Sequence, residues 1–461
     1  MIDNPLGAIM IVGGGISGMQ SALDLANSGF KVYLVESAPA IGGKMAQLDK
    51  TFPTNDCSMC IVSPKLVEVG RHRNIELLTH SDVEAVAGEA GRFTVTIANH
   101  ARYVDVLKCT GCGLCEMVCP VSFQSYFPEP PPEVEEEQQS KKKSKRKADI
   151  TSSLTPRPTS EQKWSFRVDE DLCSKCGLCH RACLHEAVQW QRKEVASIIQ
   201  DKCTGCGACY VACPEKFQAV IVEDVLDGDK SLGVALHSRS EVLKKIHAED
   251  RGRCIRCGLC TIMCDKVMGP SALKLTDQGV EVKLDACQVC GSCISVCPTD
   301  FLAIDKLTDK EPQPLLNEFN EGLDQRKPVN IFYPQAVPRV PVISEESCVK
   351  LNTDFCGTCQ TICGVGAIDY KQLGSSREIE VGSIIFSPGI EVFDAKLRGE
   401  YGYGEYPNVV TSIEFERLLS ASGPTSGTVS RPSDGSHPRK VAWVQCVGSR
   451  DVSCNRDYCS S

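Results

Sequence analysis

The sequence predicts an α/β protein in which a Rossmann-like dinucleotide-binding domain carries inserted α+β domains of the bacterial two-cluster ferredoxin type. Two observations predict this combination. A Gly-x-Gly-x-x-Gly motif follows a short apolar run near the N-terminus, where a strand, a tight turn and a helix would bind a dinucleotide. Cysteines also recur five times in the spacing Cys-x2-Cys-x2-Cys-x3-Cys, which is typical of [4Fe–4S] ligation.

Composition narrows the class of protein. The chain has 461 residues, more than one core usually holds, and 29 cysteines. It does not begin with the basic and apolar segments of a secretory signal, so we expect a cytoplasmic protein rather than a secreted disulfide scaffold. No apolar run reaches the roughly 20 residues that a membrane helix needs. The net charge is −9, and the basic block at 141–147 follows an acidic stretch, so we expect a solvated linker and no nucleic-acid binding.

The first element is a strand, glycine turn, helix and second strand. An apolar strand at 8–12 leads into Gly13, Gly15 and Gly18, and the second strand ends at Glu36. The glycines allow a tight turn and a close approach to a pyrophosphate, which lies on the helix N-terminus. The Glu36 carboxylate can accept a hydrogen bond from a ribose hydroxyl but would repel a 2′-phosphate. NAD and FAD both remain open, and NADP is disfavoured.

The later segments alternate between structure and linker. Alternating residues from about 75 to 98 predict a small antiparallel β element. Residues 121–163 are rich in proline, charge and serine, which predicts a disordered linker. The run EIEVGSIIFSPG predicts a strand that enters a turn at Ser387, and the run from Lys440 to Arg450 predicts a further buried strand.

The cysteine runs pair by their distance along the chain. The runs that begin at Cys173 and Cys203 are 30 residues apart, and those that begin at Cys254 and Cys287 are 33 apart. Each pair predicts a two-cluster ferredoxin domain, in which the last cysteine of each run ligates the other run's cluster. A sixth, looser set brings the expected number of clusters to about six. The six sets are Cys109, Cys112, Cys115 and Cys119; Cys173, Cys176, Cys179 and Cys183; Cys203, Cys206, Cys209 and Cys213; Cys254, Cys257, Cys260 and Cys264; Cys287, Cys290, Cys293 and Cys297; and Cys348, Cys356, Cys359 and Cys363.

Two of the sets have no neighbour of matching spacing. We expect the first and the last set to form one further module, split in sequence by the residues between them. Cys363 would then complete the site of the first set, and Cys119 would complete that of the last. Two independent single-cluster sites are the alternative.

The residues at 41–69, IGGKMAQLDKTFPTNDCSMCIVSPKLVEV, resemble the HdrA subunit of heterodisulfide reductase and its bacterial relatives. The resemblance resumes in CTGCGLCEMVCP, YPQAVPRVPVI, EVGSIIFSPG and WVQCVGSRD. It implies a thioredoxin-reductase-like core that binds FAD and makes Gly42, Gly43 and Lys44 further flavin contacts beside the glycine turn and Glu36. The domains expected are 1–108, an FAD-binding half; 109–120 with 345–370, the split cluster module; 121–163, a linker; 164–225 and 250–306, two ferredoxin domains; and 371–461, a return to an incomplete flavoprotein core.

The resemblance also implies a function. Members of this family are FAD and iron–sulfur oxidoreductases that split electron pairs between a disulfide-reducing partner and ferredoxin. We therefore expect partner subunits of that kind, an electron-donating hydrogenase or dehydrogenase subunit, and ferredoxin. Cys57 and Cys60 lie in the family's flavin-proximal segment, where they would serve as a redox relay or cluster ligands, or be ordinary buried cysteines. The alternative function is a polyferredoxin without flavin or a fragment of a longer subunit, since relatives run on beyond the YCS segment that ends this chain.

Overall fold

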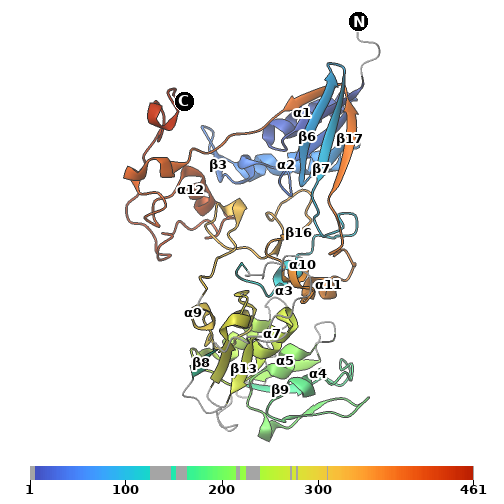
Figure 1. Ribbon diagram of the computed structural model, residues 1–461, viewed down its shortest axis with the longest axis vertical. Helices are drawn as coiled ribbons and strands as arrows, with labels where there is room; N and C mark the ends of the chain where they lie inside the picture. The colour runs from blue at the N-terminus through green and yellow to red at the C-terminus, as the bar shows by residue number, and fades with distance from the viewer. Residues whose placement is uncertain are drawn as a thin grey trace, which may run out of the picture. The chain divides into compact units, whose positions relative to one another are not determined.

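The structure, a computed structural model, forms two compact units (Figure 1). The first comprises Met1–Glu116, Leu315–Ser344 and Cys359–Ser461, and the second comprises Met117–Pro314 and Glu345–Thr358. The residues described are 6–124, 147–151, 164–213, 217, 219–224, 239–269, 272–276, 279–308 and 310–459.

The first unit is built on a parallel sheet. Its strand order is β18 (Ser383–Phe386), β1 (Ala8–Val12), β2 (Lys31–Glu36) and β5 (Ile75–Thr79). The expected strand–turn–helix–strand at the N-terminus is present, with α1 (Ile16–Asn27) as its crossover. The strands are short and apolar because both faces of the sheet are covered.

An antiparallel sheet covers one face of the parallel sheet. Its order is β17 (Ser375–Val381), β7 (Arg92–Asn99) and β6 (Ser81–Glu89) (Figure 1). Met10 and Val35 project from the parallel sheet into the core between the two sheets. The expectation of one antiparallel element over 75–98 was wrong for its first strand, because β5 pairs in parallel with β2 through Leu34 and Leu77.

The opposite face of the parallel sheet packs on helices and on a returning segment. Helix α2 (Ser58–Arg71) lies beside α1, and 315–344 adds buried aromatic side chains to the same core. This segment contains η6 (Glu318–Asn320), β15 (Val329–Asn330) and β16 (Val342–Ile343). The remaining elements of this unit are η1 (Lys44–Ala46), β3 (Lys50–Thr51), β4 (Asp56–Cys57), α3 (Leu114–Val118), α11 (Thr358–Ile362), η7 (Ala395–Leu397), η8 (Gly399–Tyr401), α12 (Ser412–Leu419) and η9 (Val452–Cys454).

The run from Lys440 to Arg450 does not form the buried strand that its apolar residues predict. It has no strand assignment in the structure, and Trp443 is 63% exposed. An apolar run forms a strand when a neighbouring sheet edge supplies hydrogen-bond partners. No such pairing involves these residues in the described part of the chain.

The second unit contains short helices that follow cysteine loops, flanked by small sheets. Its two ferredoxin-like halves have separate sheets, of orders β12–β9 with β10–β11, and β13–β14–β8. The elements of this unit are β8 (Lys147–Thr151), β9 (Trp164–Val168), α4 (Leu178–Ala182), β10 (Val188–Gln189), β11 (Ser197–Ile198), η3 (Gln200–Lys202), α5 (Ala208–Ala212), β12 (Val220–Asp224), α6 (Arg239–Ile246), η4 (Ala248–Asp250), α7 (Leu259–Met268), β13 (Leu273–Thr276), β14 (Gly279–Lys283), η5 (Leu284–Ala286), α8 (Ser292–Ser295), α9 (Ile304–Leu307) and α10 (Val349–Thr353).

The prediction of a disordered linker over 121–163 is wrong for one segment. Strand β8 lies inside that range and pairs antiparallel with β14, where Ile150 is opposite Val280. Its backbone groups find partners on the open edge of β14, which the composition of the segment does not show. The stretches 125–146 and 152–163 lie outside the described residues.

Within the described residues, no helix is both long and apolar enough to cross a membrane.

Candidate cofactor sites

The glycine turn after β1 is tight in the way its sequence predicts. Gly13 has φ +107°, and a Cβ on it would lie 2.1 Å from the carbonyl oxygen of Ser387. A Cβ on Gly18 would lie 1.9 Å from the carbonyl oxygen of Gly13. Both positions therefore require glycine, one for the turn and for the neighbouring β18 strand end, and the other for close packing of α1.

Gly15 plays a different part. It is the N-cap of α1, with φ −73°, and a Cβ on it would meet nothing within 4 Å. The glycine here is required neither by backbone conformation nor by protein packing. It leaves space at a helix N-terminus, which is the space that a pyrophosphate would fill.

Glu36 lies at the end of β2, directly beside this turn. Its Oε2 accepts a hydrogen bond from the backbone N–H of Gly14 at 2.7 Å, and its Oε1 accepts one from Ala38 at 2.8 Å. The carboxylate is therefore held at the strand end, where a ribose hydroxyl can donate to it.

The Gly-Gly-Lys segment closes over the same turn. The backbone N–H of Gly42 donates to the carbonyl oxygen of Gly14 at 2.9 Å, and a Cβ on Gly43 would lie 2.9 Å from the Cα of Gly15. Lys44 points elsewhere, because its Nζ lies 2.6 Å from Oε1 of Glu321 in an ion pair. The structure thus brings six of the seven predicted flavin contacts to one place, and it engages Lys44 with the returning segment.

Sequence reasoning missed the residues that the returning segment adds. Tyr333 is buried and donates to the carbonyl oxygen of Ile41 at 2.5 Å, and its ring stacks on Phe319 with centroids 4.6 Å apart. Burial raises the pKa of Tyr333, and the Glu36 carboxylate raises it further. The phenol therefore stays protonated beside the carboxylate. The motif YPQAVPRVPVI was the one signal in the sequence for this segment, and it did not reveal where the segment packs.

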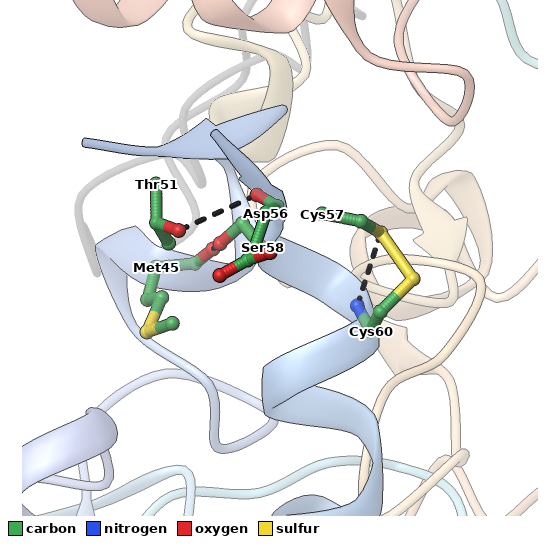
Figure 2. Close-up of a disulfide and its surroundings, with 6 residues drawn as sticks. All are labelled: Met45, Thr51, Asp56, Cys57, Ser58 and Cys60. Atoms are coloured by element: carbon green, nitrogen blue, oxygen red, sulfur yellow. Dashed lines mark hydrogen bonds between the residues drawn. A yellow bond between two sulfur atoms is a disulfide. The ribbon is translucent and has the colours of Figure 1, made fainter. Parts of the chain in front are cut away.

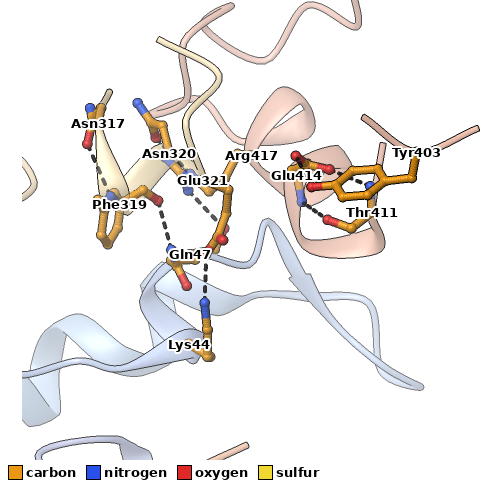
Figure 3. Close-up of polar contacts among 10 residues, drawn as sticks. All are labelled: Lys44, Gln47, Asn317, Phe319, Asn320, Glu321, Tyr403, Thr411, Glu414 and Arg417. Carbon is orange, nitrogen blue, oxygen red and sulfur yellow. Dashed lines mark hydrogen bonds and ion pairs between the residues drawn. The ribbon is translucent and has the colours of Figure 1, made fainter. Parts of the chain in front are cut away.

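Arg417 was also missed, and it joins three parts of the unit (Figure 3). Its side chain is 0% exposed, and its guanidinium lies 4.7 Å from the centre of the Phe319 ring. The Nε donates to Oδ1 of Asn320 at 2.9 Å, and Nη1 donates to the carbonyl oxygen of Gln47 at 2.8 Å. Gln47 in turn donates from Nε2 to the carbonyl oxygen of Phe319 at 2.8 Å. The arginine therefore fixes the segment after the Gly-Gly-Lys motif against the returning segment.

Helix α12 carries Arg417 and begins with a capping box. Thr411 accepts a hydrogen bond from the backbone N–H of Glu414, and the Glu414 carboxylate accepts one from the backbone N–H of Thr411. Tyr403 also donates to Glu414 at 3.0 Å. The Thr-x-x-Glu pattern was available in the sequence as a helix-start signal. It fixes the start of α12 and thereby the position of the arginine.

In the first ferredoxin half the cysteines associate across the two runs. Burial raises the pKa of Cys179 to about 11, and the nearby thiolates of Cys173, Cys176 and Cys213 raise it further. Burial likewise raises the pKa of Cys206, where Cys183 is among the groups that add to the effect. Each run thus has the last cysteine of the other run beside it, as the cross-ligated pattern predicts.

The second ferredoxin half repeats this arrangement. Burial raises the pKa of Cys260 to about 12, and among the neighbouring thiolates Cys297 adds most to this rise. Cys264 contributes in the same way to Cys290. Buried, mutually repelling thiolates are unfavourable unless positive charge stands between them, and the donor set therefore fits an iron–sulfur cubane.

The split set shows the local geometry of an intact one. Cys363 accepts a hydrogen bond from the backbone N–H of Ala367 at 3.2 Å, just as Cys183 accepts one from Ala187 at 3.3 Å. Burial raises the pKa of Cys115 to about 12, and the Cys359 thiolate is the next group that raises it. Cys179 is likewise among the thiolates that raise the pKa of Cys209 across the two runs of the first ferredoxin half, although Cys206, Cys203 and Cys183 contribute more.

The individual ligand sets and the split module stay predictions. In the described residues, no three His, Cys, Asp or Glu side chains converge as they would around a single metal ion. A cubane holds its thiolates further apart, because four irons and four sulfides stand between them. Cys348 and Cys356 belong to the second compact unit, whereas Cys359 and Cys363 belong to the first, so their common site is also a prediction.

Cys57 and Cys60 form a disulfide at the start of α2 (Figure 2). Both residues are exposed, and their Cα atoms are 5.2 Å apart. The interpretation of these residues as ordinary buried cysteines is therefore wrong. The β3–β4 hairpin, which precedes α2, is exposed from Phe52 to Cys57, and it places both cysteines at the surface.

Family models match four stretches of the chain. Residues 8–64 match the FAD dependent oxidoreductase model, and residues 105–187, 166–220 and 246–298 match 4Fe-4S dicluster domain models. The predicted fold class and the predicted cofactors, FAD and several [4Fe–4S] clusters, are confirmed by these matches. The first two dicluster matches overlap at 166–187. We assign this stretch to the second of them, because the structure places Cys213 beside Cys179.

Curated relatives match almost the whole chain. The CoB–CoM heterodisulfide reductase iron-sulfur subunit HdrA of Methanocaldococcus jannaschii is 30% identical over 451 residues, which are 98% of this chain and 39% of that protein. The second such protein of Methanopyrus kandleri is 32% identical over 452 residues, again 98% of this chain and 39% of that protein. The chain thus spans about two fifths of the length of these relatives. The L-proline dehydrogenase of P. horikoshii, a solved structure, covers 20% of this chain with a TM-score of 0.18, which is too low to support an argument.

The resemblance to the HdrA subunit of heterodisulfide reductase is therefore confirmed along 98% of the chain.

Proposed function

We propose that this chain is the FAD- and iron–sulfur-dependent electron-transfer part of a heterodisulfide-reductase-like complex. When bound, FAD exchanges electrons in pairs or singly, whereas each [4Fe–4S] cluster carries one electron. A flavin site and a set of cluster modules in one chain therefore support a junction between two-electron and one-electron transfer. The observation that carries the proposal is the open glycine turn at Gly15, held beside Glu36, in a chain that also has six cysteine sets.

The flavin site would use the residues around the glycine turn. The α1 N-terminus at Gly15 offers backbone N–H groups and the positive end of a helix dipole to the pyrophosphate. Glu36 would accept a hydrogen bond from the ribose of a bound FAD, and Gly42 and Gly43 let their segment lie against the turn. Arg417 holds that segment in place through the carbonyl of Gln47. These residues would bind and orient the group.

The cysteine modules would carry single electrons away from this site. The two ferredoxin halves meet in one apolar core that contains both Cys206 and Cys257. Burial raises the pKa of Cys257, and the next largest contribution to this rise comes from Cys206 of the other half. Clusters held by these two sets would therefore be neighbours, so the inserted domains would form one path rather than two separate ones.

The partners follow from the resemblance. Several relatives carry names that include ferredoxin and heterodisulfide reductase, such as the ferredoxin/F420H2-dependent CoB–CoM heterodisulfide reductase of Methanosarcina acetivorans. For this chain we propose a cytoplasmic complex with heterodisulfide-reductase-like subunits, a hydrogenase- or dehydrogenase-type electron donor, and ferredoxin. Splitting of electron pairs between two acceptors is part of the same proposal.

Cofactor stoichiometry tests this function. Anaerobically purified protein is expected to contain about 24 irons, four for each of six clusters, and one FAD. Full iron without FAD would contradict the flavin junction and leave a cluster-only electron carrier. Iron near eight per chain would contradict the six-cluster assignment.

A matched pair of glycine variants makes the flavin test specific. Gly15→Ala places a methyl group where the pyrophosphate would approach, and it should lower FAD affinity about tenfold, which corresponds to about 1.4 kcal/mol. Gly399→Ala is the control, because a Cβ there also meets nothing within 4 Å and its φ is not positive. FAD fluorescence on release reports occupancy. If both variants retained FAD equally, the flavin would not bind at the glycine turn.

A further inference from the structure

The Cys57–Cys60 disulfide differs from most of the cluster cysteines in its surroundings, since only Cys112 and Cys176 among them are exposed. It is the one disulfide in the described part of the chain, and both of its residues are exposed. Cysteines of the ferredoxin halves such as Cys206 and Cys260 are buried. The pair is therefore accessible to a molecule in solution, and no cluster needs it to complete any of the six sets.

The backbone that carries the pair is fixed. Ser58 is fully buried between the two cysteines. Its Oγ donates to the carbonyl oxygen of Met45 at 2.6 Å (Figure 2). Its backbone N–H donates to the carbonyl oxygen of Asp49 at 3.0 Å. The helix that follows buries Val62 and Leu66 in the core of the first unit. The two sulfur atoms are thus presented at the surface by an anchored turn.

The two sulfur atoms are not equivalent. Cys57 is the N-cap of α2, a helix of 14 residues, and its Sγ accepts a hydrogen bond from the backbone N–H of Cys60 at 3.2 Å. Helix N-termini lower the pKa of cysteine thiols and stabilise the thiolate. The better leaving group of the disulfide is therefore Cys57, and the sulfur that an incoming thiolate should attack is Cys60.

We propose that Cys57–Cys60 is a thiol–disulfide exchange site for small soluble thiols, separate from the clusters. A first thiolate, RS⁻, attacks Sγ of Cys60, forms the mixed disulfide and releases Cys57 as a thiolate. A second RS⁻ attacks the external sulfur of that mixed disulfide, and RSSR leaves with Cys60 as a thiolate. Two external thiols are thus oxidised, and the protein disulfide is reduced to a dithiol by two electrons. The exchange runs in either direction and requires neither FAD nor an intact electron-transfer function.

Redox titration of the holoprotein tests the proposal. The anaerobic protein is equilibrated with glutathione buffers of varied reduced-to-oxidised ratio, quenched in acid, alkylated and analysed by peptide mass spectrometry. The peptide that contains both cysteines should pass from below about one tenth to above about nine tenths dithiol over roughly a hundredfold range of [GSH]²/[GSSG], as a two-electron couple requires. Iron content should not change across the series.

Three results would overturn the proposal. The peptide could remain a disulfide in every buffer, which would make it a structural cross-link. It could remain a dithiol in every buffer. Cys57→Ser could also lower the iron content, which would make the pair a cluster-binding site. Cys446→Ser, which removes another exposed cysteine, is the control and should leave the titration unchanged.

Single variants test which sulfur is attacked. In Cys60→Ser the backbone N–H that donates to Cys57 is retained, so the lone Cys57 thiol should react with iodoacetamide at pH 7 about tenfold faster than the lone Cys60 thiol in Cys57→Ser. Oxidised glutathione should modify both variants, with a readout by mass shift. Equal rates, or a faster Cys60, would overturn the assignment of Cys57 as the leaving group.

Discussion

The two compact units of this chain have cores of different chemistry. Aliphatic and aromatic side chains make the core around the parallel sheet, and it includes no cysteine among the described residues. In the main core of the second unit, six of the 18 buried residues are cysteines and four are alanines. A core of the first kind is stabilised by apolar burial alone, whereas one of the second kind depends on what the thiolates bind. The difference indicates that one chain contains a self-sufficient domain and a metal-dependent one.

Removal of iron should show the largest difference in stability between the two units. Chelation of the anaerobic protein should unfold the cysteine-rich core of the second unit, because binding free energy at a structural metal site is folding free energy. The sheets of the first unit should remain folded. Hydrogen exchange followed by peptide mass spectrometry is expected to show loss of protection around 203–213 and retained protection in β1 and β2. Equal protection in both regions would contradict the metal-dependent core.

Paired cysteine variants test whether the first and last cysteine sets share their clusters in one split module. If Cys109 and Cys363 ligate the same cluster, either serine variant should lose about four irons and the double variant should lose no more. If they belong to two independent clusters, the double variant should lose about eight. Cys446→Ser is the control and should keep its iron. Iron analysis with protein quantification gives the answer.

Arg417→Met probes the self-sufficient unit. The change removes hydrogen bonds to Asn320 and to the carbonyl of Gln47, both within a buried site, and should lower the free energy of unfolding by about 2–4 kcal/mol. Arg431→Met, at an exposed position, should change it by less than about 0.5 kcal/mol. Denaturant unfolding followed by near-UV circular dichroism measures both. A similar effect of the two changes would contradict the anchoring role of Arg417.

The smallest effect concerns pH. Burial lowers the pKa of His80 to about 4, and the nearby Arg102 guanidinium lowers it further. The unfolded chain binds this proton near pH 6.5, so the unfolded state holds more protons between pH 6.5 and 4. Stability of the first unit should therefore fall as pH falls through this window, by about 1–2 kcal/mol after allowance for solvent screening.

A histidine variant checks this assignment. His80→Asn keeps a residue that tolerates the positive φ of 60° at this position but removes the titrating group. Denaturant midpoints at pH 7 and pH 5 should differ less in the variant than in the parent protein. An unchanged pH dependence would assign the effect to other groups.

The sequence predicted the parts of the fold and site that depend on local spacing. Gly13 and Gly18 are required by contacts within one turn, and the proximity of cysteines from paired runs follows from the spacing of the runs, whereas their cross-ligation stays a prediction. Tyr333 and Arg417 could not be predicted in this way, because each reaches the Gly-Gly-Lys segment from about 300 residues away or more. The same limit explains why the parallel pairing of β5 was not predicted. The alternation of residues within β5 indicates a strand, but its partner is decided by which sheet edge is open.

The pairing of β1 with β18 has a consequence for synthesis of the chain. Ile9 lies opposite Ser383, so 374 residues separate these partners along the sequence. At roughly 5–20 residues per second, a ribosome needs about 20–75 s to make the missing neighbour. During that interval β1 has an unpaired edge, and unpaired strand edges are sites of aggregation. The intervening modules depend on their clusters to fold, so slow cluster insertion would lengthen the period before β18 reaches this edge, and iron supply during translation should influence the yield of folded protein.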